Sequence, residues 1–249
     1  MLVKCHTIGF IDTNCYVVVC KKTLAAIVID PGFRKDEGEE ILREIFEQDL
    51  QVRYIVNTHG HADHTSGNSM LKQATGAEIL VHENDAWMLP KPWKAFSKIL
   101  ELEKVPPCLE CGKEVIPHLE ILENKGKAVV STDCCGIVLE LVASPPADRL
   151  LNHGDVIKFG KLEMRVIHTP GHSKGSISLY CESDSVVFTG DTLYADSIGG
   201  TDLPESSHQD IMKSLNELMN LPEHTIVYPA HGEKTTIGKE KRENPFLRT

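Results

Sequence analysis

Residues 57–67 read "NTHGHADHTSG" and place three histidines and one aspartate within six positions: His59, His61, Asp63 and His64. In an extended segment, residues two apart face the same way, so His59, His61 and Asp63 are expected to point into one space with His64 beside them. Imidazole nitrogens and carboxylate oxygens are ligands of Zn²⁺, which takes four in a tetrahedral site. Four candidates in one loop therefore indicate a site for two metal ions.

The segments around this loop predict alternating strands and helices. The β-branched runs at residues 16–20, "YVVVC", and 25–30, "AAIVID", predict a hairpin that ends in the turn "DPG". Apolar residues at helical spacing behind acidic ones predict a helix over residues 36–50. A strand over 53–58 leads into the histidine loop, and a helix around 68–76 and a strand over 78–82 follow it. This order predicts a layered α/β fold whose loops at the strand ends carry the chemistry.

The second half of the chain repeats this pattern. Residues 162–169 alternate apolar and polar positions, 176–181 and 185–190 resemble paired strands, and a helix over 211–221 precedes a strand within 225–232. We therefore expect the chain of 249 residues to form a single domain, residues 1–249, with two halves around one core. Residues from about 84 to 152, rich in proline and cysteine, are expected to form an insertion or small subdomain.

Three loops of the second half each follow an apolar strand and each present one further metal ligand beside glycine. They are "HTPGHSKGS" with His172, "FTGDTLY" with Asp191 and "YPAHGEKT" with His231. With the first loop they make seven ligands, the number that suits two zinc ions sharing one carboxylate. The seven divide into a first-ion set, a second-ion set and a bridge: His59, His61 and His172; Asp63, His64 and His231; and Asp191.

The other histidines belong to no ligand pattern and are expected at the surface or the edge of the core. Among them, His168 ends a strand and is expected to hydrogen-bond behind the metal site rather than to bind the metal. Cys15, Cys20 and Cys181 adjoin apolar strands and are expected to be buried, inert thiols. The other six histidines are His6, His82, His118, His153, His208 and His224.

The motifs "THGHADH", "TPGHSKGS", "GDTLY" and "PAHG" resemble, in order and chemistry, those of the metallo-β-lactamase superfamily. The segments "TNCYVVVC", "VIDPG" and "TTIGKEKRENPFL" resemble its glyoxalase II-like, or hydroxyacylglutathione hydrolase-like, branch. The resemblance covers both halves of the chain but not the insertion. It implies an α/β (α+β) fold, the four-layer αββα sandwich of that superfamily, with the metals at one edge of the two sheets and a cysteine-containing insertion.

The resemblance also implies a binuclear zinc-dependent hydrolase of a thioester or a related acyl compound. The nucleophile would be a hydroxide between the metals, with Asp63 orienting it and Asp191 bridging the ions as the catalytic residues. A thiol of pKa about 8.5 leaves without a general acid, which favours a thioester. Iron or manganese is an alternative to zinc. A lactonase, a mononuclear iron oxygenase similar to persulfide dioxygenases and a non-catalytic, metal-stabilised interaction module are alternative functions.

Two departures from the branch bear on the substrate. The segment "SIGGTD" has Gly200 where the family commonly has arginine, so a substrate contact through that arginine is not expected. The sequence also ends soon after "NPFLRT", without the helical region that carries basic glutathione-binding residues in glyoxalase II enzymes. Both differences argue against a glutathione-specific site. Tyr194, close to Asp191, is expected either to line the substrate pocket or to pack on the neighbouring loop.

Four cysteines of the insertion have the spacing of a zinc knuckle followed by an adjacent pair. A structural zinc, a redox pair and free thiols are all compatible with this spacing. The insertion itself is expected near the mouth of the site, as a lid or a docking surface. The four residues are Cys108, Cys111, Cys134 and Cys135.

Charge and hydropathy exclude several classes of partner. The formal net charge of -10 argues against nucleic acid, which requires clustered Lys and Arg. The apolar run "LAAIVI" is far shorter than the roughly 18 residues of a membrane span, and the start does not resemble a signal peptide. We therefore expect a cytoplasmic protein with reduced thiols that acts on a small acyl compound and contacts neither a membrane nor nucleic acid.

Overall fold

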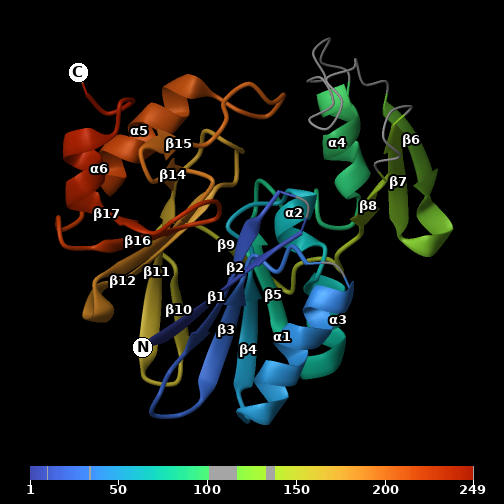
Figure 1. Cartoon of the computed structure of the whole chain (residues 1–249), viewed down its shortest axis with the longest axis horizontal. Helices are drawn as coiled ribbons and strands as arrows, with labels where there is room; N and C mark the ends of the chain where they lie inside the picture. The colour runs from blue at the N-terminus through green and yellow to red at the C-terminus, as the bar shows by residue number, and fades with distance from the viewer. Residues whose placement is uncertain (10, 34, 101–116, 133–137, 249) are drawn as a thin grey trace.

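Two six-stranded β-sheets face each other, and helices cover the outer face of each (Figure 1). The structure is a computed structural model and describes residues 1–9, 11–33, 35–100, 117–132 and 138–248. The first sheet has the order β1 (Leu2–Ile8), β2 (Thr13–Val19), β3 (Ala25–Ile29), β4 (Gln51–Val56), β5 (Glu78–His82) and β9 (Arg149–Leu151). The second has the order β10 (Val156–Phe159), β11 (Leu162–His168), β12 (Ile177–Cys181), β13 (Val186–Gly190), β16 (Ile226–Pro229) and β17 (Thr235–Thr236).

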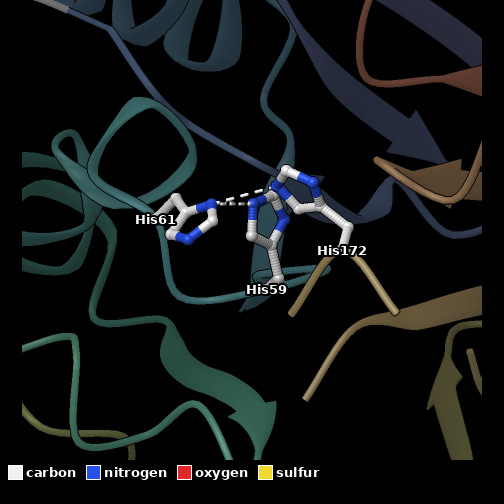
Figure 2. A group of neighbouring side chains, drawn as sticks. All are labelled: His59, His61 and His172. Atoms are coloured by element: carbon white, nitrogen blue, oxygen red, sulfur yellow. Dashed lines mark hydrogen bonds between the residues drawn. The ribbon is translucent and has the colours of Figure 1, made fainter. Parts of the chain in front are cut away.

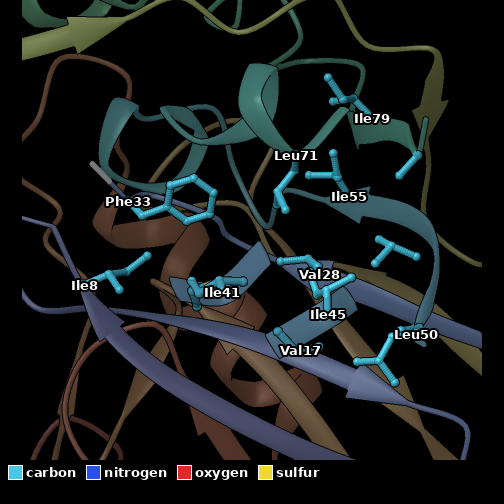
Figure 3. Close-up of a cluster of buried hydrophobic side chains, with 14 of the residues drawn as sticks. Ile8, Val17, Val28, Phe33, Ile41, Ile45, Leu50, Ile55, Leu71 and Ile79 are labelled. Carbon is cyan, nitrogen blue, oxygen red and sulfur yellow. The ribbon is translucent and has the colours of Figure 1, made fainter. Parts of the chain in front are cut away.

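Helices complete the four layers. On the first sheet they are α1 (Lys35–Glu47) and α3 (Asn68–Thr75), and on the second α5 (His208–Leu218) and α6 (Ile237–Glu243). Strand β2 is buried on both faces, and its second half is apolar. Tyr16 and Val18 enter the core between the sheets, whereas Val17 and Val19 pack under the helices. Figure 3 shows Val17 in that cluster under the helices. The αββα sandwich expected from the sequence is confirmed.

Two helices differ in extent from those expected. Helix α1 ends at Glu47 rather than at residue 50, because Asp49 takes a left-handed backbone with φ of 51° and turns the chain into β4. Phe46, one of the apolar residues at helical spacing in this segment, is 57% exposed. Helix α5 begins three residues early because the Ser207 side chain accepts a hydrogen bond from the amide of Asp210 and caps the helix.

The region between β5 and β10 contains a smaller, three-stranded sheet in addition to the two large ones (Figure 1). It has its own apolar cluster, in which Trp93, Val130 and Leu141 are buried, and Ala62 packs against that cluster. Strand β9 of this region pairs in parallel with β5 and so belongs to the first large sheet. The elements are α4 (Pro92–Leu100), β6 (Pro117–Leu122), the 3₁₀ helix η1 (Glu123–Lys125), β7 (Lys127–Thr132) and β8 (Val138–Val142). Outside the described residues lie Cys108, Cys111, Cys134 and Cys135.

Four strands of the two large sheets end at one edge of the sandwich. Strands β3, β4 and β5 are parallel, as are β13 and β16, and β11 and β13 both lie antiparallel to β12. The loops after β4, β11, β13 and β16 therefore come together there. Four short elements complete the described structure: α2 (Ala62–Thr65), the 3₁₀ helix η2 (Glu182–Asp184), β14 (Leu193–Tyr194) and β15 (Ser197–Ile198). No helix within the described residues is long and apolar enough to cross a membrane.

Candidate metal centre

The histidine loop turns back on itself after its first half. His59 and His61 follow β4, but Asp63 and His64 lie in the short helix α2, so the expectation of an extended segment through residue 63 is wrong. The turn is fixed by two side chains, because the Asn57 amide donates to the carbonyl oxygen of His64 (2.8 Å) and Thr65 Oγ1 donates to that of His61 (3.1 Å). The loop therefore presents two separate groups of ligand atoms.

The first group is three imidazoles whose ring nitrogens face one another (Figure 2). His59 Nε2 lies 2.9 Å from His61 Nδ1, and His172 Nε2 lies 3.1 Å from the same atom. Two nitrogens bound tetrahedrally to one Zn²⁺ at 2.0–2.1 Å would be about 3.3 Å apart. The three nitrogens therefore surround a point at the distance that a metal ion requires.

The protonation of this group suits metal binding. Burial, together with the neighbouring histidines, holds the pKa of His59 well below its usual value. Burial and His172 lower the pKa of His61 to about 4. Both rings are therefore neutral at neutral pH, with lone pairs free for a metal ion.

The second group combines a carboxylate with two imidazoles. His64 Nε2 lies 2.9 Å from Asp63 Oδ2, and His231 Nε2 lies 3.8 Å from that oxygen. Asp191 reaches both groups, since its Oδ1 is 3.6 Å from His64 Nε2 and its Oδ2 is 3.4 Å from His172 Nε2. The structure thus brings together all seven side chains singled out in the sequence, and their role as ligands stays a prediction.

Two observations show that the second group suits a cation. Asp191 Oδ1 is buried and accepts no hydrogen bond within the described residues, and the buried His64 Nε2 faces carboxylate oxygens of Asp63 and Asp191. Burial alone would lower the pKa of His64. The three neighbouring carboxylates nevertheless raise this pKa well above its usual value; they belong to Asp63, Asp30 and Asp191. The carboxylates around this imidazole therefore favour a positive charge among them, which a divalent metal ion supplies without a proton.

Asp30, expected from the sequence only as part of a turn, lies on the far side of the His64 ring from the other ligand atoms. Its Oδ2 lies 3.1 Å from His64 Nδ1, and its two oxygens accept hydrogen bonds from the amide and hydroxyl of Thr58, each at 2.7 Å. A carboxylate at the outer nitrogen directs the other nitrogen of the ring towards a metal. One signal was present, because an acidic residue directly after β3 must lie at the same edge as the loop after β4.

Asp85, also missed, ties the first histidine loop to the loop that carries His172. It accepts hydrogen bonds from the amides of Gly60 (3.1 Å) and Gly175 (2.8 Å) and from the hydroxyl of Ser173 (2.6 Å). It follows β5, the next strand of the parallel set, so its position was also predictable from topology. The two halves of the first group are therefore joined through one buried carboxylate.

Backbone carbonyl oxygens hold the outer nitrogens of two further imidazoles. His172 Nδ1 donates to the carbonyl of Gly200 (3.0 Å), and His231 Nδ1 donates to that of Ile11 (3.0 Å). These bonds place a proton on each Nδ1 and direct each Nε2 into the centre. Gly200, at the position where arginine is common in the resembling family, therefore contributes through its backbone.

The remaining residues discussed from the sequence lie around the centre. His168 donates from Nε2 to the carbonyl of Lys174 (2.9 Å), in the loop that carries His172, as expected of a residue behind the site. The ring of Tyr194 packs edge-on to His231, with centroids 5.9 Å apart. Burial and the neighbouring Asp191 raise the pKa of this tyrosine, so its hydroxyl stays protonated.

A cavity of about 970 Å³ opens beside the centre. Four of the seven candidate ligands line one part of it. Further lining residues come from the first turn of α1, from α2 and α3, from α4 and β8, and from loops that include Ile11, Phe33 and Leu203. The four ligands are His61, Asp63, His172 and Asp191.

Comparison with known proteins identifies one family. A family model described as "Metallo-beta-lactamase superfamily" matches residues 8–231. Hydroxyacylglutathione hydrolase GloC of Haemophilus influenzae is 31% identical over 94% of this chain and 92% of its own. The crystal structure of BLEG-1 B3 metallo-beta-lactamase is 29% identical with a TM-score of 0.77, covering 100% of both chains. That of TTHA1623 in a di-iron-bound form is 27% identical with a TM-score of 0.74, covering 98% of this chain and 100% of the other.

Proposed function

The chain belongs to the metallo-beta-lactamase superfamily, and we propose that it is a binuclear zinc hydrolase that cleaves thioesters or related acyl compounds. The observation that carries this proposal is the pair of ligand groups that share Asp191 at the edge of a cavity. A relative named as a hydroxyacylglutathione hydrolase supports an acyl thioester as the class of substrate.

Bound metal ions would supply Lewis acidity at a carbonyl group and water acidified to a pKa near 7. His59, His61 and His172 would hold the first ion, and Asp63, His64 and His231 the second, with Asp191 shared. His64 in particular lowers the pKa of Asp63 below its usual value, although burial acts in the opposite direction. Asp63 is therefore ionised and able to accept a hydrogen bond from the attacking water.

The leaving group fits the protonation states at the site. Tyr194 keeps its proton because burial and Asp191 raise its pKa, so it is a poor source of protons at neutral pH. A thiol with a pKa of about 8.5 departs as thiolate without help from an acid. We therefore favour a thioester over an amide.

Zinc suits a group of three imidazoles, but iron accepts the same nitrogen and carboxylate donors. A 27% identical structure that holds two irons makes iron the second candidate metal. An oxygenase with a single iron would use only part of the seven-residue set. The two complete groups favour a two-metal hydrolase over that alternative.

The test is reconstitution of metal-free protein with zinc, iron(II) or manganese, followed by assay of thioester, lactone and phosphodiester substrates with metal content and oxygen uptake measured in parallel. We expect thioester hydrolysis at two metals per chain without oxygen uptake. His59→Ala and Asp191→Ala should lose metal and hydrolysis and keep the fold, with His224→Ala, a histidine outside the centre, as the matched control. Undiminished turnover in either ligand variant would reject the assignment, and metal-dependent oxygen consumption would favour the oxygenase.

A further inference from the structure

The cavity beside the metal centre is larger than the acyl group of a small hydroxyacid requires. Its volume of about 970 Å³ is at the upper end of the roughly 300–1,000 Å³ that ligand pockets span. It is continuous with the centre, because His61, Asp63, His172 and Asp191 are part of its lining. A substrate whose carbonyl lies at the metals would therefore extend into it.

The walls of this cavity are mainly apolar and come from two parts of the chain. Phe33 and Met70 line one side, and Leu141 and Val142 of β8 line the other, with Ala95 of α4. Ile11 lies at the mouth with 58% of its surface exposed. Phe33, Leu141 and Ala95 are buried within this lining, whereas Ile11 is exposed. An apolar lining beside the metal centre favours an apolar ligand group.

The wall from α4 and β8 is fixed in position relative to the metal centre. Leu141 packs with Trp93 in the core of the small sheet, and both are buried. Ala62, the residue before Asp63, packs against the same cluster. The helix that carries two candidate ligands therefore also contacts the wall.

The charges among the described lining residues do not suit an anionic ligand group. Lys35 is the one cation among the described lining residues; its side chain is 87% exposed and lies 3.9 Å from Glu39. Glu140 is paired with Lys127 at 2.5 Å. Thiol carriers with several carboxylates or phosphates would require more cations than the single exposed lysine found among the described lining residues. The acyl half of a thioester is therefore the better occupant.

We propose that this cavity is an acyl-binding pocket, and that α4 and β8 make the protein selective for thioesters with long, apolar acyl groups. The inference rests on the proposed hydrolase function. It gives the region between β5 and β9 a role in specificity, since that region supplies one of the pocket's two walls.

The experiment uses the zinc-reconstituted full chain and a series of thioesters of one thiol, from acetyl to decanoyl. Each methylene buried in the pocket should raise kcat/KM about fourfold until the pocket is filled. Changing the thiol at a fixed acyl group should have a smaller effect. Calorimetric binding of a thioether analogue with a decyl chain should show a negative change in heat capacity, which marks apolar burial independently of turnover.

Charged substitutions on the two walls test where the chain binds. Val142→Asp on β8 and Met70→Glu on α3 should each lower the decanoyl-to-acetyl ratio of kcat/KM by at least about tenfold, because a carboxylate in the pocket must be desolvated. Ile121→Asp is the matched control, since Ile121 lies on β6 of the same small sheet and is 46% exposed. It should leave the ratio unchanged, and circular dichroism and zinc content verify the fold of all three variants.

The outcomes separate this inference from the function on which it rests. Hydrolysis of acetyl and decanoyl thioesters at equal kcat/KM, or unchanged selectivity in both wall variants, would overturn the acyl pocket and leave the hydrolase intact. Selectivity that follows the thiol rather than the acyl group would also overturn it. A zinc-loaded protein that hydrolyses no thioester would overturn the proposed function, and the acyl pocket with it.

Discussion

Individual carboxylates behind the candidate ligands decide how the metal centre is held. Asp30 directs His64 through its Nδ1, and Asp85 joins the loops of His61 and His172 by accepting from two backbone amides and one hydroxyl. Neither was found from the sequence, which showed the metal-ligand types but not what lies behind them. An aspartate that accepts hydrogen bonds from backbone amides of other loops is not marked by any spacing of residues in its own segment of the sequence.

Asp85→Ala is predicted to weaken metal binding more at the first ion than at the second. The change leaves the buried amides of Gly60 and Gly175 without a partner, and loss of such supporting groups typically lowers metal affinity about 10–100-fold. Competition with a chelator measures both affinities. Asp148→Asn is the control, since Asp148 also accepts a backbone amide, that of Ile79, but at the opposite end of β5. Equal affinities in the Asp85→Ala and wild-type proteins would show that Asp85 does not position the loops.

His82 is predicted to make stability depend on pH. Its ring stacks on His168 at 4.1 Å, and burial and that neighbour lower the pKa of His82 to about 4. In the unfolded chain the pKa is about 6.5, so between these values the unfolded state binds more protons and the free energy of unfolding falls as pH falls.

His82→Asn should flatten this dependence by up to about one bound proton, because asparagine does not titrate. In the wild-type protein His82 Nδ1 accepts a hydrogen bond from the backbone amide of Asn84 at 3.2 Å, and the side-chain oxygen of the introduced asparagine can accept the same bond. Urea unfolding of metal-free protein at several pH values from 4 to 6.5 measures the slope. His59 and His61 contribute to this slope in the same direction, so the relevant quantity is the difference in slope between the wild-type and His82→Asn proteins. Equal slopes in the two proteins would refute the contribution of His82.

Among the secondary-structure elements, the sequence predicted the strands and the longer helices well. It predicted less well the short segments whose conformation depends on contacts with distant parts of the chain. Apolar runs located β2, β3 and β13, and Gly76, with φ of 71°, ends α3 where the sequence placed it. Helix α2 was missed because its four residues lack any helical period, and bonds from Asn57 and Thr65 fix its turn. The region of the small sheet was expected only as an insertion or small subdomain, and its three strands were not predicted individually.

Gly32→Ala is predicted to displace α2. A Cβ on Gly32 would lie 1.3 Å from the carbonyl oxygen of Asp63, so the turn after β3 and the helix touch backbone to backbone. We expect a loss of about 1–3 kcal/mol in the free energy of unfolding, together with weaker binding of the second ion. Gly200→Ala is the milder control, because the nearest atom to its Cβ would be a side-chain oxygen of Asp202 at 3.2 Å. Native stability and two tightly bound metals in Gly32→Ala would contradict the contact.

For the whole molecule, the sandwich brings ligands from both halves of the chain to one edge. His59 and His61 come from the first sheet and His172 from the second, so an ion bound by all three links the two sheets. The sequence predicted this convergence because the two halves repeat one pattern of strand and ligand loop. It did not reveal the acyl-binding pocket, whose walls meet only when the small sheet packs beside α2 and α3.

Removal of metal is therefore predicted to destabilise the whole fold. Zinc at 1,000 times its dissociation constant adds about 4 kcal/mol to the free energy of unfolding. That corresponds to a rise in Tm of about 8–16 °C for a chain of this size. Calorimetry with zinc and with a chelator measures the difference, and Asp191→Ala should show a smaller shift. An identical Tm under both conditions would mean that the ion does not link the two sheets.

The most direct test of the two-metal centre is anomalous diffraction at the zinc edge from crystals of the reconstituted protein. Two peaks about 3.5–4 Å apart are predicted. One should be coordinated by His59 Nε2, His61 Nδ1 and His172 Nε2, and the other should lie among Asp63, His64 and His231, with Asp191 between the two. A single peak, or peaks away from these seven side chains, would contradict the account.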